Sequence, residues 1–433
     1  MDRILRARLA HTPGDPFASE DGLSYVEDGA LLLRDGRIAA VGTFDDVRRG
    51  SPHASVDDRR PAIVLPGFVD THVHLSQLPI IGRMGKPLLE WLATFTLPAE
   101  IRFLDPDYAR QAARDFLRAL ARNGTTSALV FGSHLPEAQE IFFAEAARSG
   151  LRIVSGLALS DRGLLPPLHT TPQRGYRDSL ELARRWHGHG RIRYAVTPRF
   201  AISAGDRMLE VCGRLLEEIP GAFFQTHLNE NRDEVRVVAE LFPWSKTYLG
   251  VYDRYNLVGP RSTFAHNVHP TDWELETLAR AQATVAHCPT SNAFLGSGLF
   301  PLRRHVQRGV RVALGSDVGA GTGFGFFKEG LMAYQVQMLR PDGFPLTPAH
   351  LLYLATKAGA EALGLGDEVG DFGPGKAADL VIVDPLPGTT LERVMRHAES
   401  PAALLGALFA LAGEDSIAEV MVAGETVYKR EAA

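Results

Sequence analysis

The sequence contains little cysteine and no excess of positive charge. Its 433 residues include two cysteines, Cys212 and Cys288, which are too few for a disulfide framework and fit a reducing compartment. The formal net charge is −5, and no cluster of lysine and arginine stands out. Proteins that bind nucleic acid or anionic membranes usually carry such a basic patch. We therefore expect a cytoplasmic protein with neither nucleic acid nor membrane as a partner.

Long hydrophobic runs are also missing. The most apolar window, residues 401–413, is shorter than the roughly 20 residues that a membrane-spanning helix needs, so it predicts a buried helix. The opening segment, MDRILRARLAHTP, lacks the apolar stretch and cleavage site of a secretory signal. With 45% hydrophobic and 22% charged residues, the composition is typical of a folded protein that combines a large barrel with a smaller module.

Both ends of the chain are rich in β-forming residues. Residues 29–42 predict a hairpin with Asp35 and Gly36 in its turn. Residues 375–384 and 417–429 have the same character, and Gly424 marks a turn in the second segment. The middle of the chain lacks this character. We therefore predict one small β-sandwich domain that both termini build, from residues 1–65 and 375–433.

The middle of the chain alternates short apolar runs with segments long enough for helices. Eight such runs predict a closed parallel (β/α)8 TIM barrel, the catalytic domain, over residues 66–374. They cover residues 62–75, 125–134, 152–159, 191–200, 222–230, 262–268, 283–292 and 310–317. One connecting helix is marked by Asp105 as N-cap, Pro106 at its first position and Gly124 just past its end. The alternative, an open doubly wound sheet, usually has a glycine-rich phosphate loop after its first strand, and none is seen here.

Polar residues follow the apolar runs where each predicted strand ends. In the run PGFVDTHVHLSQ, His72 and His74 are two residues apart, so in a strand both point to the same face. Taken singly, a strand-end histidine can be a hydrogen-bonded structural group, and an aspartate can belong to a turn. Their joint placement favours an active site, because barrel enzymes build theirs at the C-terminal ends of the strands. The residues concerned are His72, His74, Arg199, His227, Glu230, His266, His287 and Asp317.

Four of these residues form a ligand set, namely His72, His74, His227 and Asp317. Three imidazoles and a carboxylate suit one Zn²⁺, or alternatively Fe²⁺, and leave a position for water, whose pKa such a metal lowers toward about 7. A second metal is not expected. Two-metal barrel hydrolases commonly bridge their metals with a carboxylated lysine, and no lysine occurs between Lys86 and Lys246. The PCxxC stretch of cytidine-type zinc deaminases is also missing.

Several motifs together resemble those of the guanine deaminases, in the amidohydrolase superfamily. They are PGFVDTHVHLSQ, LLEWLATFTLPAE, VTPRF, HLNENRDEV, AHCPTSN and LGSDVGAG, and the resemblance covers almost the whole chain. It implies a barrel with a flanking β domain, Zn²⁺, a homodimer, and hydrolysis of guanine to xanthine and ammonia. The chain departs from the family pattern at Leu228, Asn229 and Ser316, none of which is an expected ligand.

The resemblance also implies catalytic roles. Deamination needs a hydroxide, a proton for the ring nitrogen and a proton for the departing ammonia. As in the resembling family, Glu230 is expected to shuttle a proton between water and ring; its structural alternative is a carboxylate that opens the following helix. His266 is expected to contact the water and the tetrahedral adduct, and Asp317 to accept a proton.

Substrate contacts are expected from Arg199 and Gln77, whose donors and acceptors match the edge of guanine. Phe200 and Trp91 are candidates for stacking on the ring, although Trp91 fits a core position equally well. His227 and Glu230 complete the expected substrate-binding set. We expect His287 to be structural and Cys288 to serve packing, since a metal hydroxide makes a covalent nucleophile superfluous.

Two other functions stay open at this point. The same site could deaminate another ring, such as 8-oxoguanine, a pterin, an s-triazine or a thioadenosine-like compound. The chain could also be a catalytically silent scaffold, but such relatives lose metal ligands and this sequence retains all four.

Overall fold

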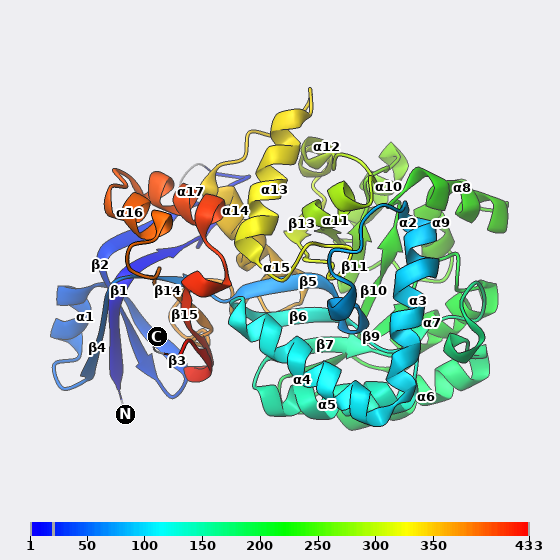
Figure 1. The fold of residues 1–433 in the computed structure, drawn as a ribbon, viewed down its shortest axis with the longest axis horizontal. Helices are drawn as coiled ribbons and strands as arrows, with labels where there is room; N and C mark the ends of the chain where they lie inside the picture. Colours follow the sequence, from blue (N-terminus) through cyan, green and yellow to red (C-terminus); the bar gives the residue numbers. More distant parts are fainter. Residues whose placement is uncertain (1, 20–21, 432–433) are drawn as a thin grey trace.

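The computed structural model describes residues 2–19 and 22–431, which build a parallel barrel and a separate mixed sheet (Figure 1). The barrel strands run in the order β13-β12-β11-β10-β9-β7-β6-β5, and the short β8 also pairs with β9. This arrangement confirms the predicted α/β class with a parallel barrel. The strands are β5 (Phe68–His74), β6 (Thr125–Phe131), β7 (Arg152–Gly156), β8 (Ala158–Leu159), β9 (Ile192–Pro198), β10 (Phe223–Leu228), β11 (Ser262–His266), β12 (Thr284–His287) and β13 (Arg311–Leu314).

The barrel is nearly closed by contacts between its first and last strands. The Thr71 hydroxyl of β5 donates to the Leu314 carbonyl of β13 at 2.8 Å. Just beyond β13, the Asp317 amide donates to the His72 carbonyl, also at 2.8 Å. The ends of β5 and β13 are therefore fixed side by side.

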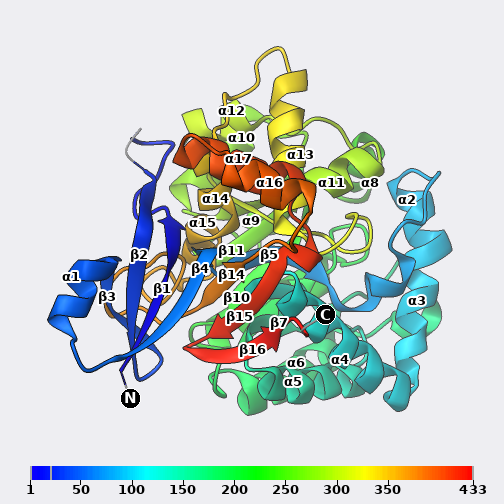
Figure 2. The same ribbon diagram turned by 60° about the vertical axis from the view of Figure 1, so that its left-hand side comes forward.

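Helices surround the barrel on its outer side (Figures 1 and 2). They are α4 (Pro106–Arg122), α5 (Pro136–Ser149), α6 (Pro172–Trp186), α7 (Asp206–Glu218), α8 (Arg232–Leu241), α9 (Tyr248–Asp253), α10 (Asp272–Arg280), α11 (Pro289–Phe294), α12 (Leu302–Gln307), α13 (Phe326–Leu339), α14 (Pro348–Ala355) and α15 (Lys357–Ala362). Between β5 and α4 the chain forms short helical pieces instead of one helix. These are η1 (Leu75–Ile80), α2 (Leu88–Trp91), η2 (Leu92–Thr96), α3 (Leu97–Ile101) and η3 (Arg102–Leu104).

Strands from both ends of the chain form the second sheet, in the order β16-β15-β14-β4-β1-β2-β3. A turn at Asp35 and Gly36, with φ of 48° and 75°, joins β2 to β3 as predicted. The hydrogen bonds run continuously through all seven strands, so this small β domain is one mixed sheet, whereas the sequence predicts a sandwich. The strands are β1 (Arg3–His11), β2 (Ser24–Arg34), β3 (Arg37–Thr43), β4 (Ser55–Pro66), β14 (Leu380–Val383), β15 (Ile417–Val422) and β16 (Glu425–Lys429), with α1 (Phe44–Gly50) after β3.

The first predicted barrel strand, residues 62–75, is two strands that belong to different sheets. Residues 62–66 end β4 of the mixed sheet, and β5 begins at Phe68. Gly67 lies between them, and a Cβ at this position would stand 2.1 Å from Oγ1 of Thr126. The chain therefore crosses between the sheets at a residue that must be small.

The apolar window near the C-terminus forms α17 (Pro401–Leu411), preceded by α16 (Thr390–Arg396). The helix packs against α13 and α14 of the barrel half (Figure 2). At this contact the Phe409 ring lies against Gly330. None of the helices in the described ranges has the length and apolar character needed to span a bilayer. By sequence, α17 belongs to the predicted small domain of residues 375–433, yet it contacts helices of the barrel half. The predicted domain boundaries at residues 65 and 375 therefore stay a prediction.

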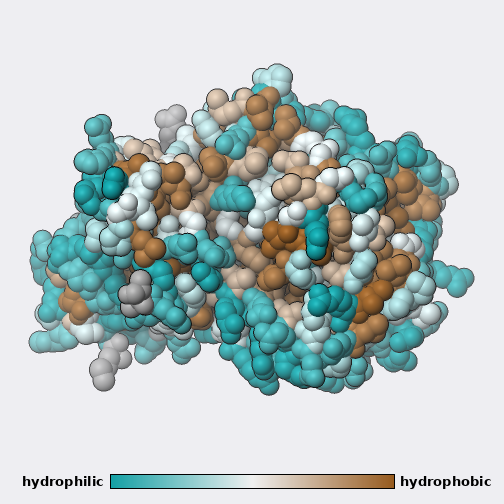
Figure 3. Space-filling view, viewed as in Figure 1, coloured by the Kyte–Doolittle hydropathy of each residue, from teal (hydrophilic) through white to brown (hydrophobic). Residues whose placement is uncertain are grey.

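The surface of the two halves differs. In the view of Figure 1, hydrophilic side chains cover most of the mixed-sheet half. Hydrophobic side chains gather nearer the middle, where β5 and the segment after it lie (Figure 3). Met84 in that segment is 74% exposed.

The N-cap of α4 provides a test of local stability. Asp105 accepts hydrogen bonds from the amides of Asp107 and Tyr108 at 2.9 and 3.4 Å. Asp105→Ala should lower the free energy of unfolding by about 1 kcal/mol, measured by urea titration, because two helix-end amides lose their acceptor. The control is Asp107→Ala in the same turn, which should change the free energy of unfolding by only a few tenths of a kcal/mol. Equal losses in the two variants would contradict the cap assignment.

Candidate active site

The strand ends bring the predicted polar side chains to one place. His72 and His74 lie on β5, His227 on β10 and His266 at the end of β11. Arg199 and Phe200 follow β9, Glu230 follows β10, and Asp317 follows β13. Gln77 and Trp91 come from η1 and α2, in the segment after β5. All of these side chains are buried.

The backbone turns sharply where several of these strands end. Asn229, His266 and Asp317 have φ values of 49°, 78° and 47°, in the left-handed region that non-glycine residues rarely adopt. Asn, Asp and His are the side chains that tolerate this region best. The chain therefore turns away from the strand direction at the barrel mouth, and these turns set the positions of His266 and Asp317.

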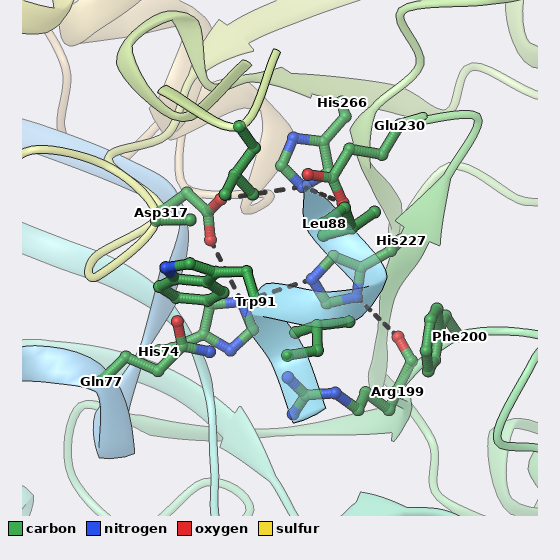
Figure 4. A pocket seen from close by; sticks show the side chains of 13 residues that line it. His74, Gln77, Leu88, Trp91, Arg199, Phe200, His227, Glu230, His266 and Asp317 are labelled. Atoms are coloured by element: carbon green, nitrogen blue, oxygen red, sulfur yellow. Dashed lines mark hydrogen bonds and ion pairs between the residues drawn. The ribbon is translucent and has the colours of Figure 1, made fainter. Parts of the chain in front are cut away.

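The histidines converge on a single point (Figure 4). Nε2 of His74 lies 3.3 Å from Nε2 of His227 and 3.2 Å from Oδ1 of Asp317. Nε2 of His72 lies 3.4 Å from the same Asp317 oxygen. Nε2 of His266 lies 3.8 Å from the other oxygen of Asp317. One carboxylate thus faces three imidazoles.

The second ring nitrogen fixes the orientation of two of these histidines. Nδ1 of His227 lies 2.6 Å from the Arg199 carbonyl, which can only accept, so this nitrogen carries the proton and Nε2 presents its lone pair. Nδ1 of His266 lies 3.0 Å from Oδ1 of Asn292. Burial lowers the pKa of His74 and of His266 to about 4, and it lowers the pKa of His227 well below its usual value. These imidazoles are therefore neutral at pH 7, as metal ligands must be.

The donor set fits a metal ion. The groups His72, His74, His227 and His72, His266, Asp317 each place their ligand atoms within 4.8 Å of one another. Nε2 of His72 and Nε2 of His266 are buried and have no hydrogen-bond partner within residues 2–19 and 22–431. A buried polar atom without a partner is costly, and a shared cation would remove that cost. Imidazole and carboxylate are also the ligands that Zn²⁺ prefers.

The two carboxylates beside this cluster have opposite ionisation tendencies. Burial alone would raise the pKa of Asp317, but the adjacent His72 and His74 side chains outweigh it and hold the pKa well below its usual value. Burial raises the pKa of Glu230 well above its usual value, and the charges of Glu234 and Asp317 raise it further. Pairs of groups with pKa values driven apart are typical of acid–base sites.

A pocket of about 350 Å³ opens beside the cluster. Oε1 of Gln77 accepts from the Gly319 amide at 3.2 Å, which fixes the orientation of its amide group. The Trp91 indole donates to the Arg83 carbonyl at 2.7 Å. The pocket is lined by His74, Gln77, Leu88, Trp91, Leu92, Arg199, Phe200, His227, Glu230, His266, Leu295, Asp317 and Ala320 (Figure 4).

Comparisons with known proteins agree with this arrangement. The profile described as "Amidohydrolase family" matches residues 63–427, and one described as "Imidazolonepropionase-like composite domain, bacteria" matches residues 29–54. The chain is 54% identical to the "Probable guanine deaminase" of Deinococcus radiodurans, over 99% of this chain and 99% of that protein. The chain belongs to the guanine deaminase family of amidohydrolases.

Solved structures of this family have the same fold. The E. coli guanine deaminase superposes with a TM-score of 0.93 at 37% identity, over 100% of both chains. The C. acetobutylicum guanine deaminase, solved with guanine bound in its active site, gives 0.91 at 28% identity, over 99% of this chain and 100% of that one. The family likeness therefore extends over both the barrel and the mixed sheet.

His287 and Cys288, at the end of β12, lie outside the pocket. The His287 ring stacks on Phe300 with centroids 4.2 Å apart, and neither of its nitrogens has a hydrogen-bond partner among the described residues. Cys288 is buried against Ala265 and Ala286. These surroundings fit the structural roles that the sequence favours for both residues.

Four charged or titratable side chains next to the site are not among the sequence-predicted residues. Asp70 accepts from the Ser316 amide and hydroxyl at 3.0 and 2.5 Å. Glu234 accepts from the Glu230 amide and the Tyr248 hydroxyl, both at 2.8 Å. Glu100 and His134 lie beside Arg199 and are described below. A carboxylate within an apolar strand, such as Asp70, is a signal that could have pointed to such a role.

Removal of a ligand tests the metal site. We expect about one Zn or Fe per chain by elemental analysis, since the cluster is one compact set of donors. His72→Ala should lose the metal and turnover together, because the remaining ligands lose their common centre. The control is His287→Gln, which changes a buried strand-end histidine outside the cluster and should retain the metal. Two metals per active chain would contradict the single-ion site.

Proposed function

We propose that the protein hydrolyses guanine to xanthine and ammonia with one bound Zn²⁺, or Fe²⁺, per chain. The observation that carries the proposal is that Arg199 and Gln77 line the same small pocket as the histidine and carboxylate cluster. Groups that can recognise a ring carbonyl thus stand beside groups that can hold a metal. The family membership supports the same reaction, as does the guanine bound in the C. acetobutylicum structure.

His72, His74, His227 and Asp317 would hold the metal, with His266 beside them. When bound, the metal would supply Lewis-acid activation of water for attack on the amino-bearing ring carbon. The chain's own acid and base groups then have to move the protons.

Glu230 is placed to move the proton. Its Oε2 lies 3.5 Å from Nε2 of His266, and its Oε1 accepts from the Ser297 hydroxyl at 3.5 Å. Burial raises the pKa of this carboxyl, which favours uptake of a proton from water, and Oε2 would then deliver that proton to the ring nitrogen. Asp317, whose pKa is lowered, stays ionised beside the histidines. His266 presents Nε2 toward both carboxylates and can hydrogen-bond to the tetrahedral adduct.

Substrate recognition would fall to the opposite side of the pocket. Arg199 extends its guanidinium from the Phe200 side toward His74 and Gln77 (Figure 4). Its N–H groups would donate to the ring carbonyl of guanine, and the Gln77 amide would hydrogen-bond to the ring edge. Trp91, Phe200 and the lining leucines supply apolar walls for a flat ring.

Among the alternatives, another purine, pterin or triazine ring remains compatible with the metal cluster, but it would use the Arg199 donors less well if it lacked the carbonyl. A silent scaffold is disfavoured because the donors converge. The homodimer and the cytoplasmic location implied by the resemblance stay predictions.

Glu230→Gln separates chemistry from metal binding. The amide keeps the shape of the side chain but cannot transfer the proton, so kcat should fall by about 10²–10⁴-fold while the metal content is unchanged. Glu329→Gln is a matched control, because Glu329 is also buried but lies on α13 and bonds to Thr290, and burial raises its pKa to about 8. The control should keep near-normal kcat. A Glu230→Gln enzyme with normal kcat would reduce Glu230 to a structural carboxylate.

Substrate choice tests the recognition side. Guanine should be converted rapidly, and adenine and guanosine poorly, in an ammonia-release assay. Adenine carries an amino group where guanine has its carbonyl, which would leave the buried Arg199 donors unpaired. Guanosine carries a ribose that the Trp91 and Phe200 walls should exclude. Arg199→Met should lower kcat/KM for guanine by at least about tenfold with its metal retained. Preference of the parent for adenine would refute the guanine assignment.

A further inference from the structure

We propose that Glu100, supported by His134, is a positioning residue that holds the Arg199 guanidinium in place to read the ring carbonyl. The inference rests on the proposed function and deepens it. Glu100 is not among the residues that line the pocket, so its effect on the substrate would act entirely through Arg199.

The contact between Glu100 and Arg199 is short and buried. Nη1 of Arg199 donates to Oε1 of Glu100 at 2.5 Å. The two side chains are 3% and 7% exposed. Glu100 lies on α3, in the segment of short helices after β5, and Arg199 follows β9. The ion pair therefore connects that segment to a barrel strand directly beside the pocket.

His134 completes the arrangement from a third element. It follows β6, and its Nε2 lies 3.3 Å from Oε2 of Glu100. Both residues are buried, so bulk water does not compete for the contact between them. One oxygen of Glu100 thus faces the guanidinium and the other faces the imidazole. The carboxylate is hydrogen-bonded to Arg199 through Oε1 and lies against His134 at Oε2.

This arrangement determines what Arg199 can offer to a ligand. A guanidinium has five N–H donors in a rigid plane, and the bond from Nη1 to Glu100 fixes the direction of the others. Burial alone would raise the pKa of Glu100, but Arg199 and His134 outweigh it and bring it to about 2. The pair is therefore ionised and balanced in charge at neutral pH, and it favours a neutral carbonyl over an anionic ligand.

Arg199 also contacts the metal cluster through its backbone. Its carbonyl accepts from Nδ1 of His227 at 2.6 Å, as described above. The same residue would then orient a ligand histidine with its main chain and the substrate with its side chain. An Arg199 side chain that lost Glu100 would be an unpaired buried cation and would shift toward water, away from the carbonyl.

Binding of two bases without an amino group tests the proposal independently of turnover. Hypoxanthine carries the ring carbonyl of guanine, and purine has the same ring without it. The affinity for each base is measured by titration calorimetry on the metal-loaded protein. Glu100→Gln should lower the affinity for hypoxanthine by about tenfold or more and the affinity for purine by less than about twofold. In an Arg199→Met background, Glu100→Gln should cause no further loss, because the two residues act as one unit.

Glu145→Gln is the matched control. Glu145 is as buried as Glu100, at 6% exposure, and pairs with Arg114 through bonds of 3.0 and 3.2 Å far from the pocket. This variant should leave the affinity for both bases unchanged. For guanine turnover, Glu100→Gln should raise KM more than it lowers kcat, which a general loss of structure would not do. If Glu100→Gln does not fold, Glu100→Asp replaces it, since the shorter carboxylate cannot keep the same contact.

The outcomes separate the two proposals. The positioning role is overturned if Glu100→Gln lowers the affinity for hypoxanthine and for purine equally, or lowers neither. The proposed function would then stay intact. A parent protein that binds neither base and releases no ammonia from guanine overturns the proposed function, and the inference with it.

Discussion

The contact between β5 and β13 is the constraint on which the site depends. The hydrogen bond from the Asp317 amide to the His72 carbonyl joins the first and last strands, and Asp70 holds Ser316 from the same side. In sequence, Asp317 lies 245 residues after His72 and 243 residues after His74. This closure nevertheless places it within ligand distance of both histidines. Barrel closure and assembly of the candidate metal site are therefore the same event. A loosely closed barrel would separate the carboxylate from its histidines.

The sequence predicts those features that depend on local patterns. Strand periodicity predicts the barrel and the shared face of His72 and His74, and the cap of α4 follows from Asp105 and Pro106. The sequence does not predict that the apolar run 62–75 is divided between two sheets at Pro66 and Gly67, because the residues before and after this point have the same composition. The contact of Glu100 with Arg199, and that of Glu234 with the Glu230 amide, also escape it. Each joins elements whose distance is set only by packing of the complete fold.

Electrostatic balance explains how a pocket can hold so many buried ionisable groups. Asp317 is stabilised as an anion by histidines, and Glu100 by Arg199 and His134. Glu230 also lies beside a histidine, His266, but burial and the charges of Glu234 and Asp317 keep its pKa raised. In the proposed reaction, the two ionised carboxylates would serve binding through their fixed charge, and Glu230 would exchange the proton. Burial is common to all three, so it is the neighbours that divide their roles.

The strand order of the mixed sheet has a consequence for synthesis of the chain. β4 pairs with β1 on one side and with β14 on the other, and β14 is made more than three hundred residues after β4 begins at Ser55. During translation, the end of β4 from Ile63 to Pro66 therefore lacks its second neighbour until the ribosome has completed the whole barrel. An exposed apolar strand edge invites pairing with other chains. This edge of β4 therefore stays open to such pairing for as long as the barrel takes to be synthesised and folded.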